Sequence, residues 1–461
     1  MGIGSIGAHV AYLVIVFFGF VGSYFIVGPQ RILDPRRIGC IYYAFMFVTY
    51  FFRPFLEYVL LRDASLLAHI NDHYEPVTFG DLTVVAFGVI VAITLIVFAM
   101  AYRVKSPKRL ERLHVSHSYP QKQLVRYGYW GLIGLGYFGF IVAMKGGGAM
   151  VKTAGGAGMV GTTGYFFLIN YMVAAGCILR FAVTGKLITS TLIGLPWLAV
   201  HVLNGYNRYI MVTYIVGVGI IWLSRRPTIP VRKLITLVCC LPVILIVFNI
   251  MNVSRRAFRD ADQLKLAIEK VMTTTPNTYF RGFAGYEGGL ITLDRHNLGL
   301  DYPNYGTHLI YKTVVWPIPR MIWTSKPYPP EFSWKYILSL GQNSTLDYSY
   351  ASVFHIFFVR GSIGLDLNEW GRFLFWINPL WLGLLAGYSE RKCLVPGGHP
   401  ILISMYAIFL ASFILIGRNT VYELAGPYIY AFYTPYILLY IWTARMHGFR
   451  QPQPMLAGGR R

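Results

Sequence analysis

The chain has 461 residues, of which 55% are hydrophobic and only 13% are charged. A soluble chain carries roughly 25% charged residues, so this composition excludes an ordinary soluble enzyme and predicts one polytopic membrane domain. The formal net charge is +22, from 41 Lys and Arg against 19 Asp and Glu. In a membrane protein such an excess indicates basic cytoplasmic linkers and anionic lipid partners, rather than nucleic acid.

Apolar runs long enough to cross the hydrocarbon core recur along the chain. They predict an all-α, polytopic integral membrane protein with about eleven transmembrane helices, at 7–27, 39–61, 81–102, 128–144, 164–182, 188–204, 209–223, 234–251, 373–388, 400–417 and 427–443. Residues 204–208 interrupt one long run and are expected to form a tight turn between two helices. A single broken helix is the alternative, and it would invert the topology of everything downstream.

Basic residues gather in the linkers after odd-numbered spans, as the positive-inside rule predicts for cytoplasmic loops. These linkers include Arg31, Arg36, Arg37, Arg103, Lys105, Arg225, Arg226, Arg391 and Lys392. The amino terminus is therefore expected outside and the carboxyl terminus in the cytoplasm. The chain then divides into helices 1–8 (1–251), a long extracytoplasmic loop (252–372), and helices 9–11 with a cytoplasmic tail (373–461).

The loop 252–372 is rich in cations, although the positive-inside rule predicts few on that side. Guanidinium groups bind phosphate oxygens through paired, charge-assisted hydrogen bonds, so a cluster of them at the outer membrane face would suit a lipid diphosphate. Solvated arginines, or arginines paired with lipid headgroups, are the alternative. The candidate diphosphate-binding residues are Arg208, Arg255, Arg256, Arg281, Arg320, Lys326, Arg360 and Arg418.

The most specific local pattern is the run from Val315 to Pro327. Prolines at 317, 319 and 327 exclude a regular helix across it, while two tryptophans flank Arg320. Tryptophan faces stack on sugar rings, although an interfacial aromatic anchor would explain the same residues. The predicted sugar platform comprises Tyr279, Trp316, Trp323 and Trp334.

Transfer of a sugar to a hydroxyl needs a base within hydrogen-bond reach of the nucleophile. Glu287 and His355 have apolar neighbours that could tune their pKa, and both are candidate catalytic bases. A carboxylate paired with a nearby arginine, or a histidine bonded in a core, is the alternative for each. The remaining acidic and histidine candidates are Asp294, His308, Asp347, Glu369 and Glu423.

The sequence contains no P-loop, dinucleotide-binding glycine motif, zinc-protease motif or serine-hydrolase elbow. No clustered carboxylates appear on the outer side, so we expect neither a metal nor a cofactor. The inner helices carry few acidic residues at mid-depth, which argues against a proton-coupled transporter.

The plan of the chain resembles bacterial O-antigen polymerases of the Wzy type and, more distantly, O-antigen ligases. Three features carry the resemblance: Asn207-Arg208-Tyr209 at an outer helix junction, Pro319-Arg320-Met321-Ile322-Trp323 followed by Lys326-Pro327, and one long outer loop with Gly361-Ser362-Ile363-Gly364 after Arg360. Motif identity is confined to residues 204–364.

This resemblance implies a multi-pass protein of the bacterial inner membrane with a fold like that of the C-type glycosyltransferases. It implies an enzyme that polymerises undecaprenyl-diphosphate-linked oligosaccharide units into surface polysaccharide, by metal-independent inverting transfer. Arg208, Arg320 and Lys326 would then bind the diphosphate. A chain-length regulator and a flippase would be its partners. An O-antigen ligase and a non-enzymatic transporter or flippase of lipid-linked glycan remain the alternatives.

Overall fold

The computed structural model describes residues 5–61, 80–108, 110, 122–145, 152–153, 156–157, 169–203, 208–225, 285–297, 361–394, 398–416 and 429–445, with shorter pieces between 262 and 325. In this part of the chain the protein is helical apart from one small hairpin. There, β1 (Lys152–Thr153) pairs antiparallel with β2 (Gly156–Ala157). The predicted span at 234–251 lies outside the described residues.

The first group of helices contains three that are long and apolar enough to cross a membrane. They are α1 (Ile6–Val27), the helix Ile38–Leu60, and α5 (Asp81–Lys105). The helix Ile38–Leu60 starts as α3 (Ile38–Phe47) and continues through two π-helical stretches, η1 (Val48–Phe52) and η2 (Phe55–Leu60). The short α2 (Pro29–Ile32) follows α1, and α19 (Ile377–Cys393) packs along α5.

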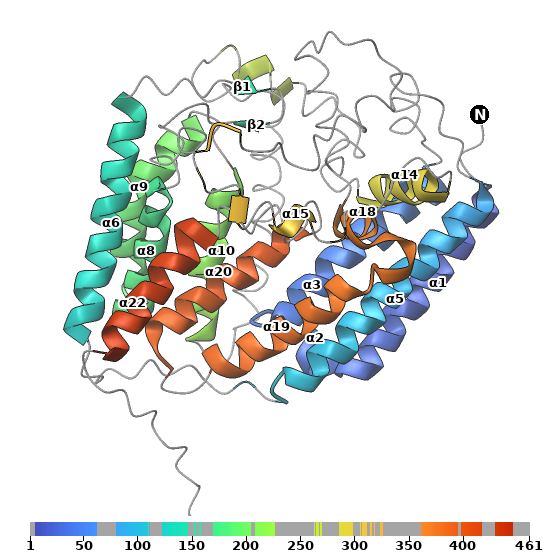
Figure 1. The fold of residues 1–461 in the computed structure, drawn as a ribbon, viewed down its shortest axis with the longest axis horizontal. Helices are drawn as coiled ribbons and strands as arrows, with labels where there is room; N and C mark the ends of the chain where they lie inside the picture. Colours follow the sequence, from blue (N-terminus) through green and yellow to red (C-terminus); the bar gives the residue numbers. More distant parts are fainter. Residues whose placement is uncertain are drawn as a thin grey trace, which may run out of the picture.

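A second group of helices lies beside the first (Figure 1). It contains α6 (Lys122–Lys145), α8 (Met172–Thr184), α9 (Leu187–Leu203), α10 (Arg208–Ser224) and α22 (Thr434–Arg445), which η7 (Ile429–Tyr433) precedes. The two groups meet at α20 (Pro400–Ile416), which packs against α3 and α19 on one side and α8 and α10 on the other.

The chain reverses direction between α9 and α10. Tyr214, in α10, donates a hydrogen bond to the carbonyl oxygen of Ser190, in α9, at 3.4 Å. A Cβ atom on Gly194 would lie 2.8 Å from the Tyr214 hydroxyl oxygen. Residues 20 and 24 positions apart cannot touch along one continuous helix, which rises about 1.5 Å per residue. The two helices therefore run back along each other, as predicted, and a single broken helix is excluded; residues 204–207 themselves lie outside the described residues.

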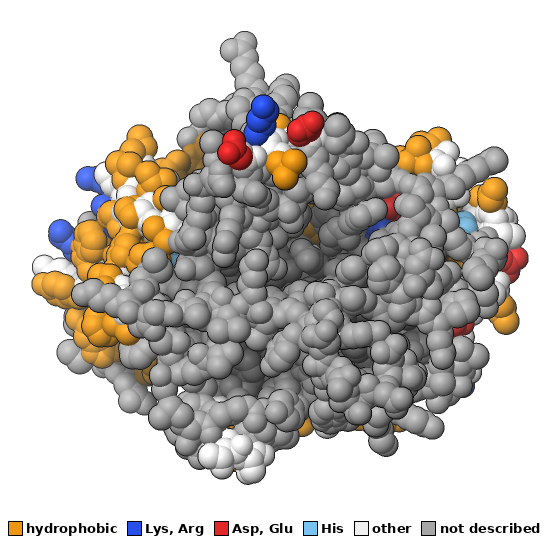
Figure 2. Space-filling view, turned by 90° about the horizontal axis from the view of Figure 1, so that it is seen from above, with side chains coloured by type: hydrophobic (Ala, Val, Ile, Leu, Met, Phe, Trp, Pro, Cys, Tyr) orange, Lys and Arg blue, Asp and Glu red, His pale blue; other side chains and the backbone are white. Residues whose placement is uncertain are grey.

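Large apolar side chains cover the outside of both groups. On α6, Tyr127, Trp130, Leu135, Phe138 and Ile141 share one face, and each is more than 40% exposed. Figure 2 shows hydrophobic side chains gathered on the flank where α6 lies. A continuous apolar face of this size marks contact with a membrane or a partner. With the three long apolar helices, it indicates an all-α membrane protein.

Three described helices belong to the segment 252–372: α14 (Gly285–Asn297), α15 (Thr307–Ile310) and α18 (Gly361–Leu374). Helix α14 packs against α18 and α5, at the end of the first group where α1 begins (Figure 1). This end is called the α14 end, and the opposite end the α2 end. Helix α18 is kinked at Gly371, where φ is 71°, so the span predicted at 373–388 is in fact the helix Ile377–Cys393.

Candidate functional site: a buried ionic cluster at the α14 end

One arginine and two glutamates form a buried cluster at the α14 end. Arg53 donates from Nη1 to Glu287 Oε2 at 2.7 Å and from Nη2 to Glu287 Oε1 at 2.9 Å. The same Nη2 donates to Glu57 Oε2 at 2.9 Å. Arg53 has no exposed surface, while Glu287 is 1% and Glu57 is 4% exposed. The cluster joins the helix Ile38–Leu60 to α14, which is 234 residues away in sequence.

Aromatic side chains and a histidine surround this ionic cluster. Tyr58 donates from its hydroxyl to Glu287 Oε1 at 2.8 Å. His9, in α1, stacks on the Tyr58 ring at 4.7 Å between centroids, and its Nδ1 is 2.8 Å from the Tyr286 hydroxyl. His9 Nε2 is buried with no hydrogen-bond partner. Three separate elements therefore contribute polar groups to one enclosed site.

The local sequence explains how these side chains meet. Arg53 and Glu57 are four residues apart, which places them on one face of their helix. They lie where the π-helical stretches occur, and such stretches are frequent at functional sites. On α14, Gly289 faces the Phe87 ring of α5 so closely that a Cβ atom would overlap it. That close approach brings Glu287 within reach of Arg53.

Further bonds fasten the same end of the molecule. Ser5 donates from its backbone N–H and its hydroxyl to Asp81, at 2.5 and 2.7 Å, which ties the start of α1 to the start of α5. Tyr12 donates to the carbonyl oxygen of Tyr50 at 2.7 Å. The Tyr50 hydroxyl in turn accepts from the backbone N–H of Ile363, in α18, at 3.2 Å. Both α14 and α18 are thus bonded to the helix Ile38–Leu60.

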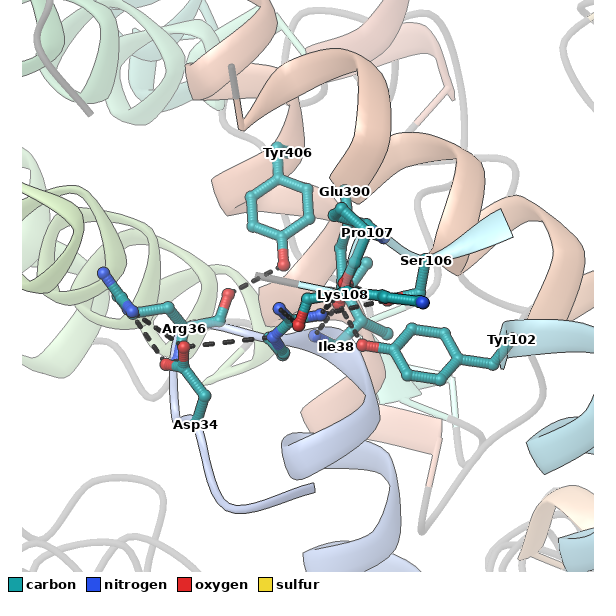
Figure 3. A network of polar contacts seen from close by, with 10 residues as sticks. Asp34, Arg36, Ile38, Tyr102, Ser106, Pro107, Lys108, Glu390 and Tyr406 are labelled. Carbon is teal, nitrogen blue, oxygen red and sulfur yellow. Dashed lines mark hydrogen bonds and ion pairs between the residues drawn. The ribbon is translucent and has the colours of Figure 1, made fainter. Parts of the chain in front are cut away.

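A second ionic cluster lies at the α2 end (Figure 3). Glu390, fully buried at the end of α19, accepts from Arg37 Nη1 at 3.2 Å and from the backbone N–H of Ile38 at 2.9 Å. It also accepts from the hydroxyls of Tyr102 and Ser106, at 2.6 and 2.8 Å. Arg37 Nε also lies 3.9 Å from Asp34 Oδ2. The Glu390 carboxylate is fully hydrogen-bonded and paired with a cation, which is the arrangement of a structural pair.

Neighbouring bonds at the α2 end extend this second cluster to α20. Arg36 donates from Nε and Nη2 to Asp34, at 2.9 and 2.8 Å, and this ion pair raises the pKa of the guanidinium. The carbonyl oxygen of Arg36 accepts from the Tyr406 hydroxyl at 2.7 Å. The loop between α2 and α3 is therefore bonded to α20, the helix at which the two groups meet (Figure 3).

Three of the predicted site residues fall within the described part of the chain. Glu287 is the one that enters a cluster, and it does so as the partner of an arginine. Arg208 is the first residue of α10 and lies at the end of that helix farther from the turn between α8 and α9. Trp323 is partly buried and donates from its indole N–H to Ser325 Oγ at 3.1 Å.

The other predicted site residues lie outside the described residues. They are the base candidate His355, the cationic residues Arg255, Arg256, Arg281, Arg320, Lys326, Arg360 and Arg418, and the aromatic residues Tyr279, Trp316 and Trp334. Among the further acidic candidates, Asp294 lies in α14, where burial raises the pKa of its carboxyl group.

Sequence reasoning missed most of the cluster at the α14 end. Arg53, Glu57 and His9 lie in apolar runs that were interpreted only as membrane spans. A signal was present, because an arginine and a glutamate four residues apart inside an apolar helix are expensive unless they are paired or functional. Their partner Glu287 could not be identified from spacing, since it comes from a distant helix.

The arrangement can hold charge and protons in an enclosed site. No group of three or more His, Cys, Asp or Glu in the described ranges is placed to bind a metal ion. The groups in the site that can hold charge or protons are a guanidinium, two carboxyl groups, an imidazole and tyrosine hydroxyls.

Comparisons with protein-family models, with curated proteins and with solved structures find no match to this chain.

Proposed function

We propose that this chain is a glycosyltransferase that polymerises undecaprenyl-diphosphate-linked oligosaccharide units at the outer face of the bacterial inner membrane. The observation that supports it best is the anchoring of α14 by Arg53 and Glu287, at the end of the helices opposite the basic α2 end. Basic linkers favour the cytoplasm, which would leave α14 and the rest of segment 252–372 on the outer side, where lipid-linked sugar units are presented.

The proposed reaction is an inverting transfer that needs no metal. A hydroxyl of the incoming unit attacks the anomeric carbon of the growing glycan, the bond from that carbon to the diphosphate oxygen breaks, and the hydroxyl proton passes to a base. Arg208, Arg320 and Lys326 bind the diphosphate and stabilise its developing charge. The remaining arginines of the predicted set are further candidates for the same role: Arg255, Arg256, Arg281, Arg360 and Arg418.

Glu287 and His355 are the two base candidates in this proposal. Both Glu287 oxygens already accept hydrogen bonds, from Arg53 and from Tyr58. Glu287 would act as the base only after one of these bonds opens, and His355 lies outside the described residues. The aromatic residues Tyr279, Trp316, Trp323 and Trp334 would support the sugar rings.

The decisive experiment is polymerisation by the purified protein in proteoliposomes that contain a defined lipid-diphosphate-linked repeat unit. We expect a ladder of longer glycans, formed equally well with a metal chelator present. A product that never exceeds one unit would refute the polymerase. Transfer of a preformed chain to a lipid A core, without elongation, would instead identify a ligase.

A transporter of lipid-linked glycan is a second candidate, because two carboxyl groups and an arginine lie buried among apolar helices. Ionisable groups inside a membrane domain frequently mark a transport path. The same proteoliposomes separate the two functions: a transporter moves the lipid-linked unit across the bilayer without lengthening it. A polymerase lengthens units supplied on one side only.

A further inference from the structure

The cluster at the α14 end contains more acid than base. One guanidinium, on Arg53, faces two carboxyl groups, on Glu57 and Glu287, and all three side chains are at least 95% buried. With both carboxyl groups ionised, the formal charge of the cluster would be −1. An uncompensated charge in an enclosed, water-poor site is strongly unfavourable, so the site must gain one positive charge or hold one proton.

The placement of the two glutamates indicates a proton. Arg53 Nη2 donates at 2.9 Å both to Glu57 Oε2 and to Glu287 Oε1, so the two carboxyl groups converge on one nitrogen atom. Two ionised carboxylates held this close in a buried site repel each other, which favours one proton shared between them. The protonated group can then donate a hydrogen bond, which an ionised carboxylate cannot do.

The remaining groups around the pair do not supply the missing charge. Of the described Lys and Arg side chains, only Arg53 forms an ion pair with either carboxyl group. None of the other described groups around the pair carries a fixed positive charge. They are His9 and Tyr12 from α1, Tyr286 from α14, Tyr58 from the helix Ile38–Leu60, and Asp81 of α5, bonded to Ser5, at the edge of the site.

Among the described groups around the pair, His9 is the other one that could become positive. Its Nδ1 contacts the Tyr286 hydroxyl, its ring lies against Tyr58, and its Nε2 has no partner in the enclosed space. An imidazolium would bury an N–H donor with nothing to receive it, at a cost in free energy. The neutral tautomer that donates from Nδ1 to the Tyr286 hydroxyl leaves only an unfilled acceptor at Nε2.

We propose that Glu57 and Glu287 form a proton-binding site that holds one shared proton and fastens α14 to the helix Ile38–Leu60. With the proton bound, the cluster is neutral: Arg53 pairs with one carboxylate, and the protonated carboxyl group bridges to it. Loss of the proton leaves two carboxylates on one guanidinium, and their repulsion loosens α14. This site operates whether or not the protein transfers sugars.

Infrared spectroscopy of the full-length protein in lipid nanodiscs tests the site directly. A protonated carboxyl group has a carbonyl band that an ionised one lacks. At neutral pH we expect the wild-type spectrum to contain the band of one protonated carboxyl group in the cluster. The spectra of Glu57→Gln and of Glu287→Gln should each lack that band. Glu269→Gln, at an exposed position outside the cluster, should lose none. A spectrum in which neither cluster variant loses that band would overturn the proposal.

Unfolding measurements provide a second, independent test. The glutamine amide in Glu57→Gln can donate permanently to Glu287 and accept from Arg53, so this variant imitates the protonated state. We expect its midpoint of thermal unfolding to equal that of the wild type at neutral pH. At alkaline pH the wild type should lose stability as the pair gives up its proton, and Glu57→Gln should not.

Two results of this second test would contradict the shared proton. A Glu57→Gln variant as unstable at neutral pH as Arg53→Gln would show that Glu57 contributes a negative charge. Stabilisation of the wild type, but not of Glu57→Gln, by Na⁺ or K⁺ over choline at equal ionic strength would show that a metal cation balances the cluster instead.

Discussion

Arg53 and Glu287 meet through two hydrogen bonds, at 2.7 and 2.9 Å, across 234 residues of sequence. Because both side chains are buried, removal of the guanidinium should leave uncompensated acid in the site. We expect Arg53→Gln to lower the free energy of unfolding by about 3–5 kcal/mol, as measured by denaturation of the purified protein in detergent.

Matched variants define what this result means. Arg53→Lys keeps the charge, but an ammonium group cannot bond at once to both Glu287 oxygens and to Glu57. Its free energy of unfolding should therefore lie between those of the wild type and Arg53→Gln. Arg126→Gln, at an exposed position on α6, should stay within about 0.5 kcal/mol of the wild type. Equal stability of Arg53→Gln and Arg126→Gln would contradict the buried ion pair.

The pair at the α2 end predicts strong non-additivity. Arg37→Met leaves the buried Glu390 without its cation and should cost about 3–5 kcal/mol. Glu390→Met should cost less, because Arg37 keeps the carboxylate of Asp34 at 3.9 Å. The double variant removes both charges and should recover most of that loss, because an apolar pair of similar volume can replace a buried ion pair. A double variant whose loss equals the sum of the two single losses would refute the coupling.

Two glycines on α6 differ only in their surroundings. A Cβ atom on Gly136 would collide with the backbone nitrogen of Val173 in α8, whereas one on Gly134 would meet nothing within 4 Å. We expect Gly136→Ala to destabilise the protein by about 1–3 kcal/mol through overpacking. Gly134→Ala should be neutral or stabilising by up to about 1 kcal/mol, because alanine favours a helix. Similar unfolding midpoints for both variants would disprove the α6–α8 contact.

His399 predicts a pH dependence of stability on the acidic side. Burial lowers the pKa of this imidazole to about 4, and its Nδ1 accepts from the backbone N–H of Ile401 at 3.3 Å. In the unfolded chain the pKa is about 6.5, so between these values the unfolded state binds more protons. Stability is then complete above pH 6.5 and declines as the pH falls towards 4, by at most ~3 kcal/mol.

The test compares unfolding midpoints of the wild type and His399→Gln between pH 4 and pH 7.5. Glutamine retains an acceptor for Ile401 but does not titrate, so the decline should be smaller in the variant. An identical decline in both proteins would assign the acid sensitivity to other groups.

The proposed polymerase makes Arg320 the most informative position for activity. We expect Arg320→Ala to reduce glycan elongation in proteoliposomes by about 10²–10³-fold, the typical loss when one charge-stabilising donor is removed. Arg320→Lys should restore part of it. Arg126→Ala, which removes a cation of α6 outside the predicted site, is the control and should elongate glycans as the wild type does. If Arg320→Ala also elongated glycans at the wild-type rate, Arg320 would not belong to the diphosphate site.

Helix positions could be predicted from the sequence because an apolar segment that crosses a membrane must satisfy its own backbone hydrogen bonds, which favours a helix. Every N–H and C=O in hydrocarbon must bond within the segment, so an apolar run of sufficient length is enough to locate α1 or α5. The turn between α9 and α10 was equally visible, because Asn204 and Gly205 interrupt the apolar pattern. The beginning of α19 could not be predicted, because residues 373–376 are as apolar as α19 although they form the end of α18 and the turn after it.

The ionic clusters could be predicted only in part. The spacing of Arg53 and Glu57 is local and readable, but the choice of Glu287 as third member depends on how α14 packs beside Phe87. Glu287 stood out in the sequence for its apolar neighbours, which is a property of its own helix. Its pairing with an arginine, the alternative considered for it, depends on tertiary structure that spacing does not encode.

The bond between Arg37 and Glu390 also has a consequence for synthesis in the cell. The two residues are 353 positions apart, so at 5–20 residues per second the ribosome needs roughly 20–70 s to deliver the second after the first. Throughout that interval the guanidinium must rely on Asp34, three residues earlier, and on water or lipid headgroups at the membrane surface. Assembly of the α2 end is therefore a late event, completed only after residue 390 of the 461 has been translated and inserted.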